Sequence, residues 1–452
     1  MASDAALAKP RLRAGRVAPQ LPSSSQVRTY GPFALGIYLL ATTRWGSYVL
    51  PGPPYISDIV IGLLIGERIV AATRRRLALG AIELTTGVTC GILLAWTGIR
   101  FAFGGDSLNA LRDIASYAYA VLVFLTPARP WTDRERQRME KVLWAGLMFH
   151  AAWITLGRIA PSTVASLPAL GGGQSALFQG RPDVDATITG LTCVLALNRL
   201  ASGRMQGVSL LVAAWSAALT LSAHSRAAIA ASVVELLIFL LWTPAPRRVV
   251  RRYGPRYLIV VLLLAVPALG YGISTSNAVQ RLGQATGSFL PFVPSHGDPT
   301  SSTTGTARAR RRAWQAIEVY LEAKTSRALF GVGFGPDFLH ASGGDVLLLG
   351  GTNEDVRQPH NYLINSWARI GLVGLAIVSA MLMAGLRLAY RLGRLHSGDE
   401  LDLAAIILVT GLPVAATYGV VMESPFGAVP YFWALGYLGF RALELRRAVA
   451  LR

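Results

Sequence analysis

Residues 304–314 read Thr-Gly-Thr-Ala-Arg-Ala-Arg-Arg-Arg-Ala-Trp, residues 330–335 read Phe-Gly-Val-Gly-Phe-Gly, and residues 359–363 read Pro-His-Asn-Tyr-Leu. These segments belong to a polar stretch, from about residue 274 to 360, in a chain otherwise rich in long apolar runs. Directly after it, Arg-Ile-Gly-Leu-Val-Gly-Leu at 369–375 opens another apolar run. An arginine cluster and a histidine between membrane-type segments indicate a site for an anionic, lipid-borne substrate at a membrane surface.

The composition places the chain among helical membrane proteins. Hydrophobic residues make up 52% of the chain and charged residues only 15%. A helix needs about 20 apolar residues to cross ~30 Å of hydrocarbon, and long unbroken apolar runs favour helices over a barrel. The predicted fold class is therefore an all-α polytopic membrane protein with about twelve spans. The expected spans are residues 31–50, 55–72, 78–98, 110–126, 141–159, 184–201, 206–222, 226–242, 257–273, 370–389, 401–421 and 427–443.

The net charge of +19 is distributed in a way that orients the chain in the membrane. If the N-terminus is cytoplasmic, most Lys and Arg residues fall in inner loops and the short outer loops carry few. This bias explains the charge without nucleic acid as a partner. Both termini are then cytoplasmic. The expected parts are a disordered basic tail (1–30), transmembrane helices one to nine (31–273), an extracytoplasmic catalytic loop with interfacial helices (274–369), transmembrane helices ten to twelve (370–443) and a cytoplasmic tail (444–452).

The outward-facing loop is predicted to contain one clear helix, a glycine turn and a short interfacial helix. Thr306 is a suitable N-cap for the clear helix. Apolar residues then recur at helical spacing on one face: Trp314, Ile317 and Leu321. The three glycines of 331–335 predict a tight turn that brings the histidine near the arginine helix; they lack the Lys-Ser/Thr of a P-loop. Residues 361–368 carry a Tyr and a Trp suited to the headgroup region.

The order of these motifs resembles the O-antigen ligase/polymerase family, over roughly residues 110–440 and most specifically at 304–375. The residues that carry the resemblance are Ser225-Arg226 at the outer start of a span, Arg310 four residues before Trp314, the glycines of 331–335, and His360-Asn361 ahead of a Gly-Leu-x-Gly-Leu helix. The resemblance implies a GT-C-like glycosyltransferase of the bacterial inner membrane. Such an enzyme moves a glycan from undecaprenyl diphosphate to an acceptor hydroxyl on the outer face, with inversion and without a metal.

His360 and Glu423 are the candidate catalytic residues. The resemblance implies that His360 is the base, since an imidazole with a pKa of ~6.5 accepts a hydroxyl proton near neutral pH. The alternative is an ordinary interfacial histidine. Glu423 is the only carboxylate between the last two spans. It is expected to orient His360, pair with an arginine or hold the acceptor hydroxyl; the alternative is an exposed loop acid. Asn361, Trp314 and Gly333 are expected to support the site.

Arginines are the candidate ligands of the diphosphate, because a guanidinium group binds two phosphate oxygens at once. The resemblance maps the family's two phosphate-binding arginines to Arg226 and Arg310. The full expected set is Arg226, Arg310, Arg308, Arg311 and Arg112. For the cluster at 308–312 the alternatives are a solvated helix face or an anchor for anionic lipids. Arg226 has the alternative of reaching back to the surface, and Arg112, next to Asp113, that of a structural ion pair.

No cofactor is expected, and no His, Cys or acidic cluster has the spacing of metal ligands. The expected partners are an undecaprenyl-diphosphate-linked glycan donor, a glycan or lipid acceptor, and membrane lipids. A ligase and a repeat-unit polymerase both fit the motifs, because acceptor choice depends on the shape of the pocket. A lipid-linked glycan flippase or transporter is the rival from another class; the sequence lacks the inverted repeats typical of transporters.

Overall fold

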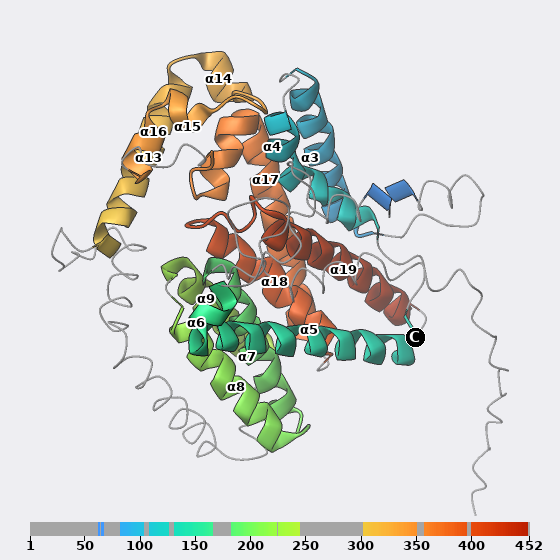
Figure 1. Ribbon diagram of the computed structural model, residues 1–452. Helices are drawn as coiled ribbons and strands as arrows, with labels where there is room; N and C mark the ends of the chain where they lie inside the picture. Colours follow the sequence, from blue (N-terminus) through green and yellow to red (C-terminus); the bar gives the residue numbers. More distant parts are fainter. Residues whose placement is uncertain are drawn as a thin grey trace, which may run out of the picture.

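The structure, a computed structural model, describes residues 62, 63, 65, 66, 82–103, 108–125, 131–165, 182–223, 225–244, 302–349, 357–395 and 399–450. Within these ranges the chain forms helices joined by turns, with no strand (Figure 1). The helices are α3 (Leu84–Ala102), α4 (Leu108–Ala118), the 3-10 helix η2 (Tyr119–Phe124), α5 (Asp133–Ile159), α6 (Pro161–Ala165), α7 (Pro182–Ala201), α8 (Gln206–Leu221), α9 (Arg226–Trp242), α13 (Ser302–Glu322), α14 (Thr325–Phe330), α15 (Phe338–Ala341), α16 (Gly344–Leu349), α17 (Tyr362–Leu395), α18 (Glu400–Ala416) and α19 (Pro425–Ala450).

The expected spans that fall in the described ranges are helical, which confirms the all-α prediction there, although that at 110–126 is divided between α4 and the 3-10 helix η2 and that at 401–421 extends past the end of α18. In the part of the chain that the structure describes, four helices are long and apolar enough to cross a membrane: Leu84–Ala102, Asp133–Ile159, Asp183–Ala201 and Tyr362–Leu395. Gln206–Leu221 and Ile229–Trp242 are shorter apolar helices. The expected spans at 31–50 and 257–273 lie outside the described residues, as does nearly all of that at 55–72. The number of about twelve spans stays a prediction.

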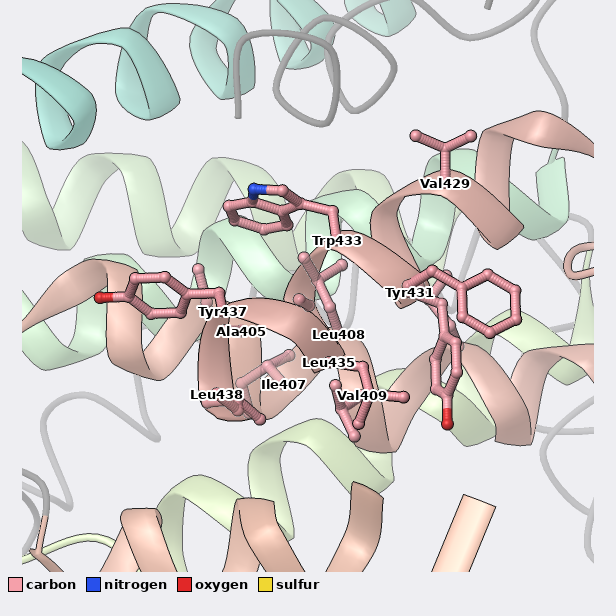
Figure 2. Packing of buried hydrophobic residues seen from close by; sticks show 14 of the residues in the cluster. Ala405, Ile407, Leu408, Val409, Val429, Tyr431, Trp433, Leu435, Tyr437 and Leu438 are labelled. Carbon is pink, nitrogen blue, oxygen red and sulfur yellow. The ribbon is translucent and has the colours of Figure 1, made fainter. Parts of the chain in front are cut away.

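Helices α18 and α19 form the centre of the bundle. Every residue of α18 from Glu400 to Leu412 is buried, as expected for a helix that is apolar all round. Figure 2 shows Leu408 and Val409 of α18 packed among Trp433, Leu435 and other apolar side chains of α19. Helices α7, α9 and α17 pack around α18. The expected last two spans are therefore the internal core against which the other helices pack.

The N-terminal end of α18 is held by partly buried ion pairs to three other helices. Asp399 pairs with Arg136 of α5 at 2.8 Å, and Glu400 pairs with Arg199 of α7 at 2.7 Å. Asp402 pairs with Arg441 of α19, also at 2.8 Å. All three arginines belong to segments that the charge pattern assigns to the cytoplasmic side. They meet at one end of α18, and the side of the membrane that this end faces stays a prediction.

The outer loop contains more helix than the sequence indicated. The prediction of one clear helix is wrong, because α13 is followed by the short helices α14, α15 and α16. These have six or fewer residues, too few for a periodic pattern to appear. Thr306 is not the N-cap, since α13 begins at Ser302; several Ser and Thr residues before Thr306 offer the same cap chemistry.

Two close glycines dock the outer loop onto α17 (Figure 1, orange). Gly331 and Gly371 have φ of 76° and 74°, and a Cβ on either would collide with the backbone of the other's segment. The amide of Val332 donates to the carbonyl of Ala368 at 2.7 Å, next to this contact. Gly371 kinks α17, so a short helix precedes the span, as predicted for 361–368. The predicted glycine turn is also present.

Candidate functional site

His360 lies between a segment without regular secondary structure and the start of α17, in an unusual backbone conformation. Its φ is 56°, in the left-handed region that costs a non-glycine residue about 1–2 kcal/mol. Such a conformation persists where the neighbouring structure fixes it. On the C-terminal side, Asn361 does so: its Oδ1 accepts hydrogen bonds from the amides of Leu363 and Ile364 at 3.0 and 3.2 Å. Asn361 therefore supports His360 by capping α17.

The residues before His360 are tied to separate elements. The indole Nε1 of Trp314 on α13 donates to the carbonyl oxygen of Pro359 at 2.7 Å. The side-chain amide of Gln358 donates to the carbonyl oxygen of Glu423, in the α18–α19 connection, at 3.3 Å. His360 is thus held at the meeting point of α13, α17 and the connection between the last two helices, and its ring is half-buried.

Arg310 faces the same connection from α13. Its Nη1 donates to the carbonyl oxygen of Tyr418 at 2.6 Å, and the rings of Trp314 and Tyr418 lie 5.7 Å apart. Burial lowers the pKa of the Arg310 guanidinium, while the Asp183 carboxylate at the start of α7 acts in the opposite direction. Arginine remains protonated in proteins even so. A half-buried cation is consequently positioned beside the turn that carries Glu423.

Glu423 is buried, with 7% of its surface exposed. The alternative of an exposed loop acid is therefore wrong. The sequence placed Glu423 in a short outer turn, but α19 begins directly afterwards at Pro425, and the turn is covered by the segment before His360 and by α13. The structure brings Glu423 and His360 to neighbouring segments.

The other candidate arginines are either exposed or have side chains outside the described part of the structure. Arg311 and Arg312 are exposed on α13, and Arg112 is exposed on α4. Arg226 is the first residue of α9, directly after Ser225, as the resemblance implied. The side chains of Arg226 and Arg308 lie outside the described part of the structure. Of the expected diphosphate ligands, Arg310 is the one whose described contacts link it to the segments of His360 and Glu423.

Asp113 is the organising residue that sequence reasoning missed. Its Oδ2 lies 2.9 Å from Nη2 of Arg369, with the two side chains 4% and 1% exposed. The same oxygen accepts from the amide of Gly335 at 3.0 Å and lies 3.4 Å from Nη2 of Arg357. Asp113 thereby joins α4 to the glycine turn, to α17 and to the segment before His360. A signal was present, since Asp113 and Arg369 are opposite charges at the outer starts of two expected spans.

Gly333 contributes to the same assembly through its backbone. Its φ is 83°, and its amide donates to the carbonyl of Arg369 at 3.0 Å. The Arg369 guanidinium in turn donates to the carbonyl of Pro336 at 2.6 Å. Among the residues that the structure describes, no group of three or more His, Cys, Asp or Glu side chains is arranged to hold a metal ion.

A comparison with protein families matches residues 211–379 to the family described as O-antigen ligase. Over these residues the chain is similar to an O-antigen ligase domain. This domain runs from α8 to the middle of α17 and includes Arg226, Arg310 and His360, whereas Asp113 and Glu423 lie outside it. Proteins with an O-antigen ligase domain are ligase- or polymerase-like glycosyltransferases of the membrane that act on lipid-linked glycans. No curated protein matches the chain.

Proposed function

We propose that the protein moves a glycan from undecaprenyl diphosphate to an acceptor hydroxyl on the outer face of the bacterial cytoplasmic membrane. The observation that carries the proposal is the convergence of three segments. Arg310 on α13 contacts the α18–α19 connection, Trp314 on α13 contacts the segment of His360, and that segment contacts the backbone of Glu423. Three segments from distant parts of the sequence, which carry a cation, an imidazole and a carboxylate, thus contact one another.

In this mechanism His360 accepts the proton of the acceptor hydroxyl, and the hydroxyl oxygen attacks the anomeric carbon of the donor sugar. The bond from that carbon to the diphosphate oxygen breaks, with inversion. The diphosphate leaves with its electron pair, and Arg310, together with Arg226, balances the negative charge. Fixed cations stabilise a developing anion without reorganisation, so they replace the divalent metal that many glycosyltransferases use.

The left-handed backbone of His360 supports the catalytic assignment over an ordinary interfacial histidine. A residue at φ 56° is held there by contacts on both sides, and strained conformations of this kind concentrate at functional sites. Glu423 is suited to orient the imidazole or to hold the acceptor hydroxyl. We also propose that the protein has a GT-C-like fold with about twelve spans and that both of its termini are cytoplasmic.

The decisive test is mass spectrometry of surface glycans in a deletion strain complemented with wild-type protein, His360→Ala or His340→Ala. His340 is the matched control, because it lies in the same outer loop with its side chain 79% exposed and paired with Asp345. We expect His340→Ala to complement and His360→Ala to fail. Full-length polymer left on the lipid indicates a ligase, and single lipid-linked repeats indicate a polymerase. Normal glycan with His360→Ala would contradict the enzymatic proposal.

The purified protein provides the second arm of the test. Turnover of a lipid-diphosphate glycan should continue in EDTA, since the arginines take the charge of the leaving group. A strict requirement for an added divalent cation would contradict the metal-independent mechanism. Export of intact lipid-linked glycan across vesicle membranes without any glycosyl transfer would instead favour the flippase.

A further inference from the structure

The C-terminal half of α14 exposes two large apolar side chains, although α14 belongs to the outer loop. Leu329 is 40% and Phe330 43% exposed. The residues at the start of this short helix are polar and exposed: Lys324, Thr325 and Ser326. An apolar end and a polar end on one six-residue helix indicate that its two ends face different environments.

Contacts with α3 place the apolar end below the surface of the membrane. The ring centroids of Phe330 and Trp96 are 6.2 Å apart. Trp96 precedes the end of α3 by six residues, which at ~1.5 Å per residue is about 9 Å along the helix. Because α3 is long and apolar enough to cross a membrane, Phe330 lies beside a part of α3 that is inside a spanning segment. One turn further out, Arg100 donates to the carbonyl of Gly331 at 3.2 Å.

Contacts with α17 independently place Leu329 and Phe330 beside a second candidate membrane span. The backbone of Leu329 and Phe330 packs against Gly371, where the kink of α17 leads into its long apolar part. The next residues, Leu372 and Val373, are 41% and 37% exposed. The exposed apolar surface of α14 therefore continues directly into the exposed surface of a candidate membrane span.

We propose that Leu329 and Phe330 are inserted into the outer leaflet of the bilayer and are covered by lipid acyl chains. Apolar side chains that continue a lipid-exposed helix face avoid water when lipid covers them as well. The polar start of α14, with Lys324, then lies among the headgroups, as in other interfacial helices. Since α14 leads directly into the glycine turn, insertion fixes the height of the outer loop relative to the membrane surface.

The test uses nitroxide spin labels on the full chain in vesicles of phosphatidylethanolamine and phosphatidylglycerol, with Cys90 and Cys193 replaced by Ala. Single cysteines are placed as Phe330→Cys, Leu329→Cys and Ser326→Cys, the last being the matched control on the polar end of the same helix. Collision rates are measured with oxygen, which concentrates in hydrocarbon, and with a nickel chelate, which stays in water. The oxygen-to-nickel ratio should be several-fold higher at 329 and 330 than at 326.

Two results would overturn the inference. If the labels at 329 and 330 collide with the nickel chelate as often as the label at 326, the helix faces water. If both reagents are excluded from 329 and 330, protein covers the surface, either another segment of this chain or a second copy. Leu372→Cys on α17 is expected to report hydrocarbon in every case, which checks that the labelled protein is folded and inserted.

Discussion

The indole of Trp314 donates a hydrogen bond to the carbonyl oxygen of Pro359, the residue directly before His360. This contact connects the arginine helix to the proposed catalytic histidine through one backbone group. It also gives a physical role to the spacing in the sequence. Arg310 and Trp314 are four residues apart, so they lie on the same face of α13, one directed at Tyr418 and the other at Pro359.

Trp314→Phe removes the donor and keeps an aromatic ring. We expect turnover to fall roughly 10- to 100-fold, because a small displacement of a catalytic group has effects of this size, while donor binding changes little. The matched control is Trp367→Phe, which removes an indole hydrogen bond to Ala328 in the same loop. The measurement is turnover and donor affinity for both variants. Equal losses in the two would show that Trp314 acts only on the general stability of the loop.

Arg310 and His360 are expected to have separable roles. His360→Ala should retain donor binding and lose ~10²-fold or more in turnover. Arg310→Ala should also weaken donor binding, by about tenfold or more, since charge-assisted hydrogen bonds to the diphosphate are lost. Arg310→Lys should rescue only in part, because an ammonium group lacks the bidentate geometry.

Arg312→Ala is the control for Arg310, since Arg312 is exposed on the same helix. Donor binding and turnover are compared across the arginine and histidine variants. If Arg310→Ala and Arg312→Ala lose equally little donor binding and turnover, and His360→Ala is fully active, the arginine cluster is only a basic surface and does not bind the diphosphate.

Asp113→Asn should destabilise the fold strongly. It leaves the Arg369 cation buried without its partner, which typically costs about 3–5 kcal/mol. Asp345→Asn is the control, because its partner His340 is mostly exposed and a surface pair contributes about 1 kcal/mol or less. Thermal unfolding in detergent measures both. In the double variant Asp113→Asn/Arg369→Gln the loss should be smaller than the sum of the single losses; additivity would mean that the two residues do not interact energetically.

Gly371→Ala tests the contact between the glycine turn and α17. An added Cβ meets the backbone of Leu329 and Phe330, at a φ that alanine disfavours, so we expect a large drop in melting temperature. Gly98→Ala on α3 is the control, because a Cβ there meets nothing within 4 Å, and alanine favours a helix by up to about 1 kcal/mol over glycine. A similar melting temperature for the two variants would argue against the close approach.

The orientation in the membrane is tested by cysteine labelling of intact cells. Ser326→Cys on α14 should react with a membrane-impermeant maleimide from outside, whereas Gln137→Cys, exposed near the start of α5, should react only after permeabilisation. Native Cys90 is buried and Cys193 half-buried, so both are expected to react slowly. Labelling of Gln137→Cys in intact cells would overturn the topology.

Apolar runs predicted the helices well, because spans are long and a bilayer demands apolar side chains over a fixed length. The tight turn at 331–335 was also predicted, since glycine marks backbone that other residues adopt poorly, whereas the kink at Gly371 was not predicted. Motif order singled out His360, Arg310 and Trp314 as candidates, which stay predictions, and it could not give their contacts. The opposite charges of Asp113 and Arg369 were visible at the starts of two expected spans, but single-sequence patterns do not show which charges pair across such a separation in the chain. The burial of Glu423 was missed for the same reason, because its cover comes from distant segments.

The two ends of α18 differ in the contacts that hold them. At its N-terminal end, ion pairs with α5, α7 and α19 join helix to helix. Past its C-terminal end, the carbonyl oxygen of Tyr418 accepts a hydrogen bond from Arg310 of α13, and that of Glu423 accepts one from Gln358, in the segment before His360. Connections tolerate insertion and substitution far better than packed helices do. Under the proposed function, related proteins are therefore expected to differ in their acceptors through changes around Tyr418 and Glu423, with the ion-paired end of α18 left unchanged.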